Sequence, residues 1–262
     1  MAAIDPARLE REVRELEQHF SEPAALRREV LALLDFYANR ARRPGASSAA
    51  SDVPCSFGVP RPVLHSMRKV LRQRAADDPG GAMAAADALW ETGYREARLL
   101  AAGIVGSQRG GTVADWVEAH APHCDDSVAL AELAGAGLSG WRKSDVSAFL
   151  ERVATWMEGQ GPRLQSLAMS ALTAAVEDTS FEHLPALLTR LEGKAGKARG
   201  EAKRAMVSLV RSMARRSPPE AARFLLDEME RGTPGASRLA ASVLEAFPEA
   251  QRRRLASALR AH

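Results

Sequence analysis

The feature that most constrains the fold is a pair of short apolar stretches separated by a glycine, at residues 89–105. Leu89 and Trp90 close one apolar helix face, and Gly93 interrupts the helical pattern directly after them. Apolar residues then recur three and four positions apart, which places them on one buried face of a second helix: Ala97, Leu100, Ala101 and Ile104. The sequence therefore predicts a helix–turn–helix unit that stacks on similar units before and after it.

Glu96 and Arg98 fall in the first turn of that second helix, beside its buried face. An acidic side chain early in a helix is stabilised by the helix macrodipole. We therefore interpret Glu96 as a charge that favours the start of the helix.

The same alternation of apolar helical stretches and breaks with Pro or Gly continues along the chain. Asp5-Pro6 places a favoured N-cap residue before a proline at the first helical position. A second helix is expected from Ser21-Glu22-Pro23 to about Arg43-Pro44-Gly45. Further along we predict a turn over 77–81, then helices over 82–90, 141–156, 161–176, 181–191, 201–216, 218–230 and 233–246.

Strand patterns are hard to find, because Val, Ile and Thr do not alternate with polar residues, and most apolar residues are Ala and Leu. The sequence predicts an all-α fold, an α-solenoid of HEAT-like antiparallel helix pairs. We expect a single domain over residues 1–262. Its parts would be N-terminal helices at 1–45, repeats at 56–230 and a C-terminal helix pair at 233–262.

Composition excludes several classes of protein. No apolar run approaches the roughly 20 residues that span a bilayer, and the charged residues 1–17 do not resemble a secretory signal peptide. Cys55 and Cys124 lie far apart in unlike contexts and do not indicate a disulfide framework. We expect a cytoplasmic monomer.

The net charge of +3 is unevenly distributed. Between Thr112 and Gly137 every charged residue is acidic: Asp115, Glu118, Asp125, Asp126 and Glu132. In the stretch 61–74 all the charged residues are cations, and the C-terminal quarter is rich in Arg and Lys. A basic surface with one acidic region is typical of a protein that binds a polyanion and keeps carboxylates at its reactive site. The alternative is that Arg is simply the surface cation that this chain favours.

Three stretches resemble the DNA alkylation repair family, the AlkD-like glycosylases with HEAT-like repeats. Residues 57–64, Phe-Gly-Val-Pro-Arg-Pro-Val-Leu, resemble the family's Gly-Val-x-x-Pro-x-Leu start of a helix. Leu89-Trp90 followed by Glu96-x-Arg98-x-x-Ala101 is similar to its Leu-Trp and Glu-x-Arg-x-x-Ala helix pair. Residues 203–225 resemble its late helix pair, although Ser208 replaces the usual Trp. The matches occur in order from about Ser56 to Leu226.

The resemblance implies hydrolysis of the N-glycosidic bond of purines alkylated at N3 or N7, without a metal or cofactor. A cationic alkylpurine is already a good leaving group. The enzyme then needs an anion to stabilise oxocarbenium character and orient a water, aromatic side chains near the sugar, and cations that hold phosphates. The implied partner is double-stranded DNA, alkylated or branched.

The resemblance also points to candidate site residues. The family's Trp-Asp-x-x-Asp motif would fall on residues 121–125, so that Asp125 takes the carboxylate position and Asp126 is the alternative if the register slips by one. The aromatic residue that starts the motif is missing. The family's later Arg falls near Arg163, although the register favours Gln165. As an alternative to catalysis, Asp125 and Asp126 are acids that start and cap a helix.

His123 and Cys124 stand beside these carboxylates, but no second Cys/His pair supports a metal site. Three functions therefore remain open: a DNA glycosylase acting through Asp125, a catalytically silent relative that binds DNA, and a HEAT-like scaffold for proteins. For the first two, the candidate DNA-binding residues are Arg61, Arg98, Arg163, Lys203, Arg204 and Arg211.

Overall fold

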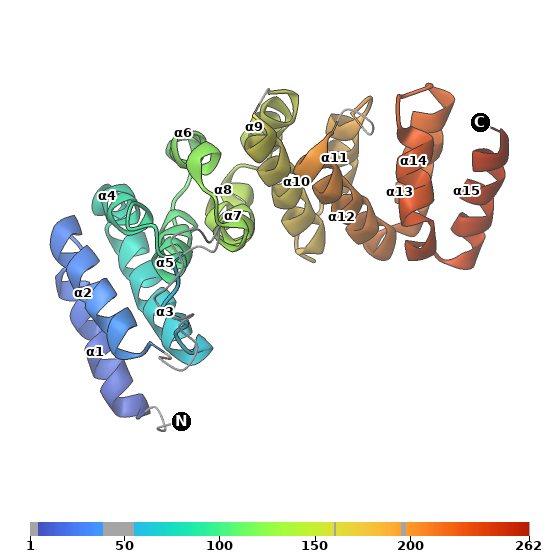
Figure 1. Cartoon of the computed structure of the whole chain (residues 1–262). Helices are drawn as coiled ribbons and strands as arrows, with labels where there is room; N and C mark the ends of the chain where they lie inside the picture. The colour runs from blue at the N-terminus through green and yellow to red at the C-terminus, as the bar shows by residue number, and fades with distance from the viewer. Residues whose placement is uncertain (1–4, 39–54, 160, 195–197, 262) are drawn as a thin grey trace. The chain divides into compact units, whose positions relative to one another are not determined.

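The structure is a computed structural model of the chain, and it describes residues 5–38, 55–159, 161–194 and 198–261. The chain divides into two compact units, Met1–Ser144 and Asp145–His262 (Figure 1). No strand occurs among the described residues, so the all-α prediction is confirmed. The single domain expected over 1–262 stays a prediction.

The first unit is built from eight α-helices and two short irregular helices. They are α1 (Pro6–Gln18), α2 (Pro23–Phe36), α3 (Arg61–Asp77), α4 (Pro79–Trp90), α5 (Arg95–Val105), α6 (Gly111–His120), the 3₁₀ helix η2 (Ala121–His123), α7 (Ser127–Glu132), the π-helix η3 (Leu133–Gly137) and α8 (Ser139–Ser144). Gly93 has a φ of 75° in the turn between α4 and α5, which is a conformation that favours glycine. The helix–turn–helix predicted for residues 89–105 is confirmed.

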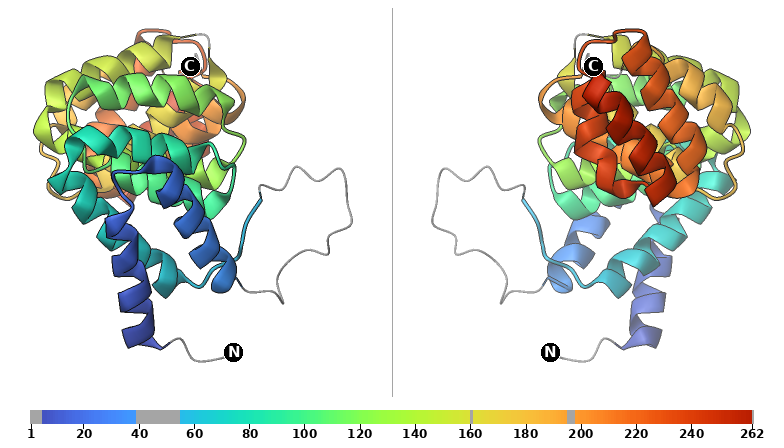
Figure 2. Two further views of the ribbon diagram at one scale, coloured as in Figure 1. Left: turned by 90° about the vertical axis from the view of Figure 1, so that its left-hand side faces the viewer. Right: turned by 90° about the vertical axis from the view of Figure 1, so that its right-hand side faces the viewer.

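The second unit continues with α9 (Val146–Glu158), α10 (Pro162–Glu177), α11 (Leu184–Leu191), α12 (Gly200–Arg216), α13 (Pro218–Glu230), α14 (Ala236–Val243), the 3₁₀ helix η4 (Leu244–Ala246) and α15 (Glu249–Ala261). Figure 2 shows α1 and α2 of the first unit beside one another in blue, and α13 to α15 of the second unit packed together in orange to red. None of the described helices combines the length and the apolar composition that a membrane span requires.

In the first unit, α5 and the segment α7–η3 run side by side in the same direction. Arg95 in the first turn of α5 donates a hydrogen bond to Asp126, the N-cap of α7, at 2.8 Å. At the far end, the backbone of Gly106 lies against that of Ala136, because a Cβ on Gly106 would meet the Ala136 carbonyl oxygen at 2.0 Å. Equivalent helices of stacked repeats run parallel. We therefore assign α5 and the segment α7–η3 to two neighbouring repeats.

In the second unit, Arg216 ties the C-terminal ends of α10 and α12 together. Its Nη1 donates to the carbonyl oxygens of Val176 and Asp178, both at 2.7 Å. Its Nη2 donates to the carbonyl oxygen of Phe181. These bonds satisfy carbonyl groups that the end of a helix leaves without an intrahelical partner. Arg216 therefore caps α10, although it lies in the Arg- and Lys-rich C-terminal quarter that the charge pattern predicts to be part of a polyanion-binding surface.

The predicted single helix over 141–156 is wrong, because Asp145 divides it into α8 and α9. The backbone of Asp145 is extended, with a φ of −151°, and its side chain caps α9 by accepting a hydrogen bond from Ala148 N at 2.9 Å. A side-chain acceptor at this position satisfies a backbone donor that the start of a helix leaves free. This break coincides with the boundary between the two units.

Other boundaries also differ from the prediction. The helix α2 ends at Phe36, where Ala38 N bonds to the carbonyl oxygen of Asp35 in a tighter turn; residues 43–45, where its end was predicted, lie outside the described residues. The turn predicted over 77–81 shrinks to Asp78, which caps α4 through Gly81 N. By contrast, α13 spans Pro218–Glu230 as predicted.

Candidate functional site

Of the two adjacent carboxylates, Asp125 and Asp126, it is Asp126 that has a structural role. Its side chain is fully buried and accepts hydrogen bonds from Val128 N at 2.9 Å and Ala129 N at 3.3 Å, which makes it the N-cap of α7. The other carboxylate oxygen accepts from Arg95 Nε at 2.8 Å. Asp126 therefore fixes the start of α7 on the first turn of α5 and has no exposed oxygen for a substrate.

Asp125 is the exposed member of the pair, with 72% of its side chain accessible to solvent. Its Oδ1 accepts a hydrogen bond from Arg98 Nη1 at 3.0 Å, across from α5. The Arg98 side chain is only 13% exposed, and its guanidinium carbon lies 5.6 Å from the centre of a Trp90 ring. Arg98 thus fixes one oxygen of Asp125 while being fixed itself by a cation–π contact.

The Trp90 ring next to Arg98 belongs to a cluster of aromatic side chains. The Trp90 and Trp116 rings meet edge to face at 5.1 Å, and Trp116 stacks on His120 at 4.1 Å. Asp87 accepts a hydrogen bond from Trp116 Nε1 at 2.5 Å, and its Oδ1 lies 3.3 Å from His120 Nε2. Both tryptophans are buried, so the cluster is a packed core that positions Arg98 and presents no open ring beside Asp125.

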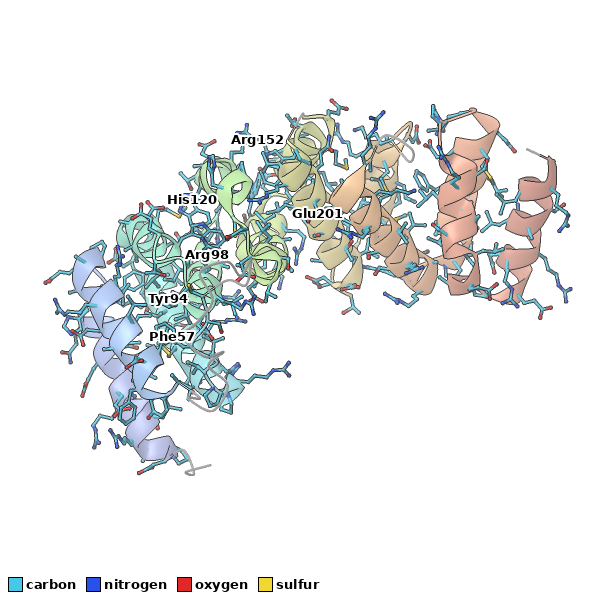
Figure 3. The ribbon with its side chains drawn as sticks, viewed as in Figure 1. Phe57, Tyr94, Arg98, His120, Arg152 and Glu201 are labelled. Atoms are coloured by element: carbon cyan, nitrogen blue, oxygen red, sulfur yellow. The ribbon has the colours of Figure 1, made fainter. Side chains whose placement is uncertain are left out.

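Glu96 does more than favour the start of α5. It is buried, and it accepts hydrogen bonds from Ser56 Oγ at 2.7 Å, Phe57 N at 3.1 Å and Gly58 N at 2.8 Å. Three donors on one buried carboxylate anchor the segment that leads into α3. Phe57 then stacks on Tyr94 with their rings 4.4 Å apart, on the same side of the first unit as Arg98 (Figure 3). This anchor holds α3 against the helix that carries Arg98.

The predicted DNA-binding cations differ in their surroundings. Arg61 is exposed in the first turn of α3, and Arg98 is already paired with Asp125. In the second unit, α10 and α12 run parallel, since their C-terminal ends meet at Arg216; Arg163 therefore lies at the same end of this helix pair as Lys203 and Arg204.

Arg204 and Arg211, two of the candidate DNA-binding cations, contact other residues of the second unit. Arg204 lies 3.9 Å from Glu201 and Arg211 donates to the carbonyl oxygen of Ser242 at 3.1 Å, whereas Lys203 is exposed. The assignment of all these cations to DNA stays a prediction, as does that of Asp125 to catalysis.

Cys124 beside these carboxylates is buried, and burial raises the pKa of its thiol above the ordinary value, so the neutral form is favoured. Its Sγ donates to the carbonyl oxygen of Asp126 at 3.6 Å. In the part of the chain that the structure describes, no group of three or more His, Cys, Asp or Glu side chains is arranged to hold a metal ion.

The family model for the DNA alkylation repair enzyme matches residues 30–244, most of the chain. The chain belongs to the DNA alkylation repair enzyme family. This confirms the resemblance drawn from residues 57–64, 89–101 and 203–225, and with it the HEAT-like α-solenoid as the fold class. No curated protein and no solved structure matches the chain significantly.

Sequence reasoning missed the supporting residues of this site. The sequence pattern places Trp90 on a helix face and assigns no role to Arg95, although Trp90 lies against the Arg98 guanidinium and Arg95 donates to Asp126. The sequence contains part of the information that would identify these residues. Arg95 and Arg98 are three positions apart and so share a helix face, and the paired acids at 125–126 are suitable partners for that face. Nothing in the sequence, however, aligns two segments that are 27 residues apart.

Proposed function

We propose that this family member hydrolyses the N-glycosidic bond of N3- and N7-alkylated purines in duplex DNA, with Asp125 as the active carboxylate. The observation that carries the proposal is the geometry of Asp125, an exposed carboxylate whose Oδ1 is held by Arg98. A fixed anion of this kind costs little reorganisation when positive charge develops on the sugar. Membership of a DNA repair family supports DNA as the substrate.

The chemistry requires little else of the protein. An alkylated purine carries a positive charge and leaves as a neutral base, so no general acid is needed. The exposed carboxylate of Asp125 would face the sugar, where positive charge grows as the bond breaks, and would orient the attacking water. Cations such as Arg61 in the first unit and Lys203 in the second would hold phosphates of the duplex. This proposal requires no metal or cofactor.

Base release from duplexes containing N7-methylguanine or N3-methyladenine tests the activity directly. The protein is incubated with each duplex, free base is quantified by chromatography, and spontaneous release in its absence is subtracted. Release of either base above the spontaneous rate supports the proposal. Binding of both duplexes without any release would contradict it.

The second candidate is a catalytically inactive relative that binds damaged or branched DNA. It is favoured by the pairing of Asp125 with Arg98, which already compensates part of the carboxylate's charge, and by the buried alanine at the motif's first position, Ala121. Family membership alone does not decide between the two, because one fold can retain binding after losing its chemistry. Tight binding to a branched duplex, together with no base release, would support this second function.

A protein-binding scaffold is the third candidate, and salt dependence separates it from the other two. Charge reversal at Arg61 and Lys203 should weaken binding to all DNA sequences alike, because phosphate contacts carry no sequence information. Each lost phosphate contact should reduce the magnitude of the salt slope by about 0.9. A duplex affinity that responds neither to salt nor to these reversals would support the protein-binding scaffold.

A further inference from the structure

A groove between α1 and α2 of the first unit is lined in part by apolar side chains. It has a volume of about 230 Å³, and its apolar lining residues are Leu16, Ala32, Leu33 and Phe36. We call it the α1–α2 groove. Phe36 is 55% exposed, and among the described residues only Val128 is another large apolar side chain that remains exposed. Isolated exposed apolar side chains are common, but apolar side chains gathered in a groove mark a surface that another molecule can cover.

Both walls of the groove are stripes along a helix. On α1 the lining residues occupy positions i, i+3, i+4 and i+7 counted from Glu12, and on α2 they occupy the same positions counted from Glu29. Tyr37 Oη donates to Glu12 at 2.8 Å, so the end of α2 lies beside the middle of α1 and the two helices are antiparallel. Seven residues at about 1.5 Å each give a groove roughly 10 Å long, or two helical turns. This is the geometry in which a partner helix inserts its apolar side chains.

The apolar side chains of the groove are separate from those that hold α2 in the fold. Leu26, Val30 and Leu34 form the fully buried face of α2. Leu33 and Phe36 lie on the face beside it and stay partly or largely exposed. The two helices pack mainly on other elements, α1 on α3 and α2 on α4. The side on which α1 and α2 face one another is therefore left open.

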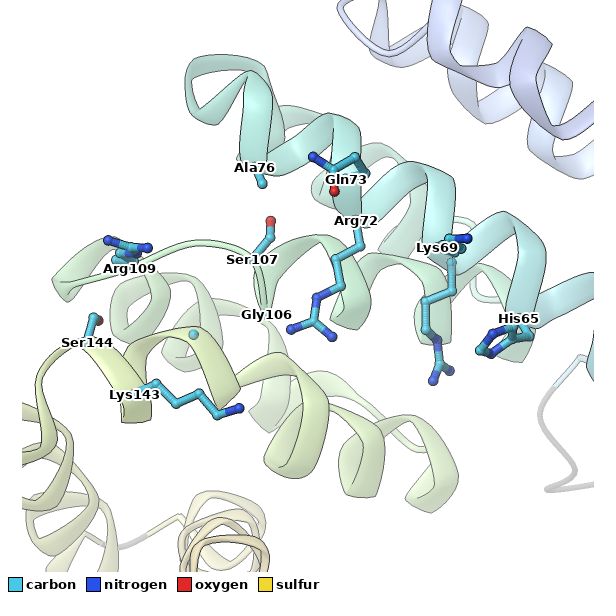
Figure 4. A pocket seen from close by; sticks show the side chains of 12 residues that line it. His65, Lys69, Arg72, Gln73, Ala76, Gly106, Ser107, Arg109, Lys143 and Ser144 are labelled. Carbon is cyan, nitrogen blue, oxygen red and sulfur yellow. The ribbon is translucent and has the colours of Figure 1, made fainter. Parts of the chain in front are cut away.

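The charge of the groove is negative. Glu12, Glu15 and Glu29 line it, whereas none of the described Arg or Lys side chains does. Glu12 is paired with Arg8 and Glu29 with its exposed neighbour Arg28, and no ion pair joins Glu15 to another described residue. In the pocket between α3, the end of α5 and α8, by contrast, Arg and Lys supply the charge and no described carboxylate takes part (Figure 4). The α1–α2 groove therefore attracts a cationic partner and repels phosphates.

Arg8 shows which chemistry the edge of the groove favours. Its guanidinium carbon lies 4.5 Å from the centre of the Phe36 ring, and its Nε donates to Glu12 at 2.7 Å. One cation thus contacts an aromatic face and a carboxylate of the lining at the same time. A partner with basic side chains beside apolar ones can make contacts of the same two kinds.

We propose that the α1–α2 groove binds a basic amphipathic helix of a partner protein. Apolar residues three and four positions apart on that helix enter between α1 and α2, and Lys or Arg beside them face Glu15 and Glu29. A second copy of the chain fits less well, because a twofold contact through the same groove would bring these carboxylates together. The proposal does not depend on the proposed function, since neither helix contributes a residue assigned to DNA or to catalysis.

The test uses two labelled synthetic peptides of the same Lys and Leu composition, each about 14 residues or four helical turns long. In one, Leu recurs at i, i+3, i+4 and i+7; in the other, the order is scrambled so that no apolar helix face forms. Fluorescence anisotropy measures the binding of each peptide to the whole chain and to three variants. Phe36→Ala removes the exposed ring, and Glu15→Lys/Glu29→Lys reverses two charges of the groove. Glu10→Lys/Glu17→Lys is the matched control, because it reverses two exposed acids of α1 that do not line the groove.

The amphipathic peptide should bind wild type, and the scrambled peptide should bind on the order of tenfold more weakly. Phe36→Ala and the groove reversal should each weaken the amphipathic peptide on the order of tenfold, as truncation of a central interface residue does. The control should stay within about threefold, because exposed charges contribute little. Equal binding of both peptides, equal losses in the groove and control variants, or no binding of the amphipathic peptide to wild type would each overturn the proposal.

Circular dichroism and thermal unfolding verify that each variant is folded. If the double reversal does not fold, Glu15→Gln/Glu29→Gln removes the charges alone and should show a smaller loss in the same direction; wild-type affinity would contradict the proposal. Two further measurements test the other occupants. A wild-type dimer in sedimentation that Glu15→Lys/Glu29→Lys dissociates would replace the partner helix with a second copy. Duplex binding that is lost in Phe36→Ala would make the groove a DNA contact and overturn the proposal as well.

Discussion

Arg98 holds Asp125 at 3.0 Å while its own guanidinium lies over Trp90, so the exposed carboxylate of this segment is oriented by a cation that is itself oriented by an aromatic ring. The pairing has two opposite consequences for catalysis. It fixes the position of the carboxylate, which favours electrostatic stabilisation of a developing cation. It also offsets part of the negative charge that such stabilisation requires.

Asp125→Asn separates these consequences. If Asp125 stabilises the transition state, the variant should raise the barrier to base release by about 2–4 kcal/mol, as the loss of a single electrostatic group does elsewhere. Duplex affinity should stay level or rise slightly, because an anion near phosphates has been removed. Single-turnover release of N7-methylguanine, measured together with duplex binding, reads out both quantities.

Glu118→Gln is the matched control for that experiment, since Glu118 is another carboxylate of the same acidic stretch, on α6. It should release base at a rate close to that of wild type. If Glu118→Gln abolishes release while Asp125→Asn does not, the active carboxylate lies on α6, and the motif is aligned differently from the register that places Asp125 at its end.

Asp126 should matter for stability rather than for chemistry. Asp126→Ala removes the N-cap of α7 and leaves Arg95 without its buried partner, so we expect unfolding to become easier by about 2–4 kcal/mol. Asp145→Ala removes only an exposed N-cap, that of α9, and should cost about 1 kcal/mol. Urea denaturation compares the two variants. A smaller loss for Asp126→Ala than for Asp145→Ala would contradict the structural role of Asp126.

The two cysteines should differ in reactivity. Cys55 is exposed, whereas Cys124 is buried and its thiol pKa is raised by that burial. Because the thiolate is the nucleophile, a thiol reagent should modify Cys55 alone in the folded protein and both cysteines in denaturant. Mass spectrometry of the labelled peptides distinguishes them. Rapid labelling of Cys124 under native conditions would show that its segment opens.

The raised pKa of Cys124 also predicts the direction of a pH effect on stability. The folded state disfavours the thiolate, so the stabilisation is complete below the unfolded pKa of about 8.5 and is lost as pH rises through the folded pKa. Wild type should therefore lose stability at alkaline pH relative to Cys124→Ala, which has no thiol there to ionise. Parallel pH profiles for the two proteins would exclude this contribution.

The sequence was sufficient for the helices and for most of their ends. Asp5-Pro6 starts α1, Gly93 divides α4 from α5, and Ser217-Pro218 divides α12 from α13, because each of these breaks depends on the chemistry of one or two local residues. The break at Asp145 was missed, since the apolar periodicity continues across it and only the side-chain cap reveals the division.

The contacts between repeats could not be predicted in this way. Glu96 reaches Phe57 across 39 residues, and Lys69 and Arg72 of α3 line the same pocket as Lys143 of α8. Such pairings depend on how far one helix slides along its neighbour, which periodicity within each helix does not determine. The sequence predicts a cluster of cations at 61–74, but it does not predict the ion pair of Arg68 with Glu132 or the pocket that Lys69 and Arg72 line.

The last prediction concerns Gly106, where the backbone at the end of α5 lies close to that of η3. A methyl group at this position would lie 2.0 Å from the carbonyl oxygen of Ala136, so Gly106→Ala must push α5 and η3 apart. Overpacking against backbone should cost about 1–3 kcal/mol of unfolding free energy. Gly135→Ala is the matched control, because a Cβ there meets no atom within 4 Å, and its effect should stay within about 0.5 kcal/mol. Thermal unfolding of both variants gives the comparison. If Gly106→Ala is as stable as Gly135→Ala, the close approach of the two backbones is not present in solution.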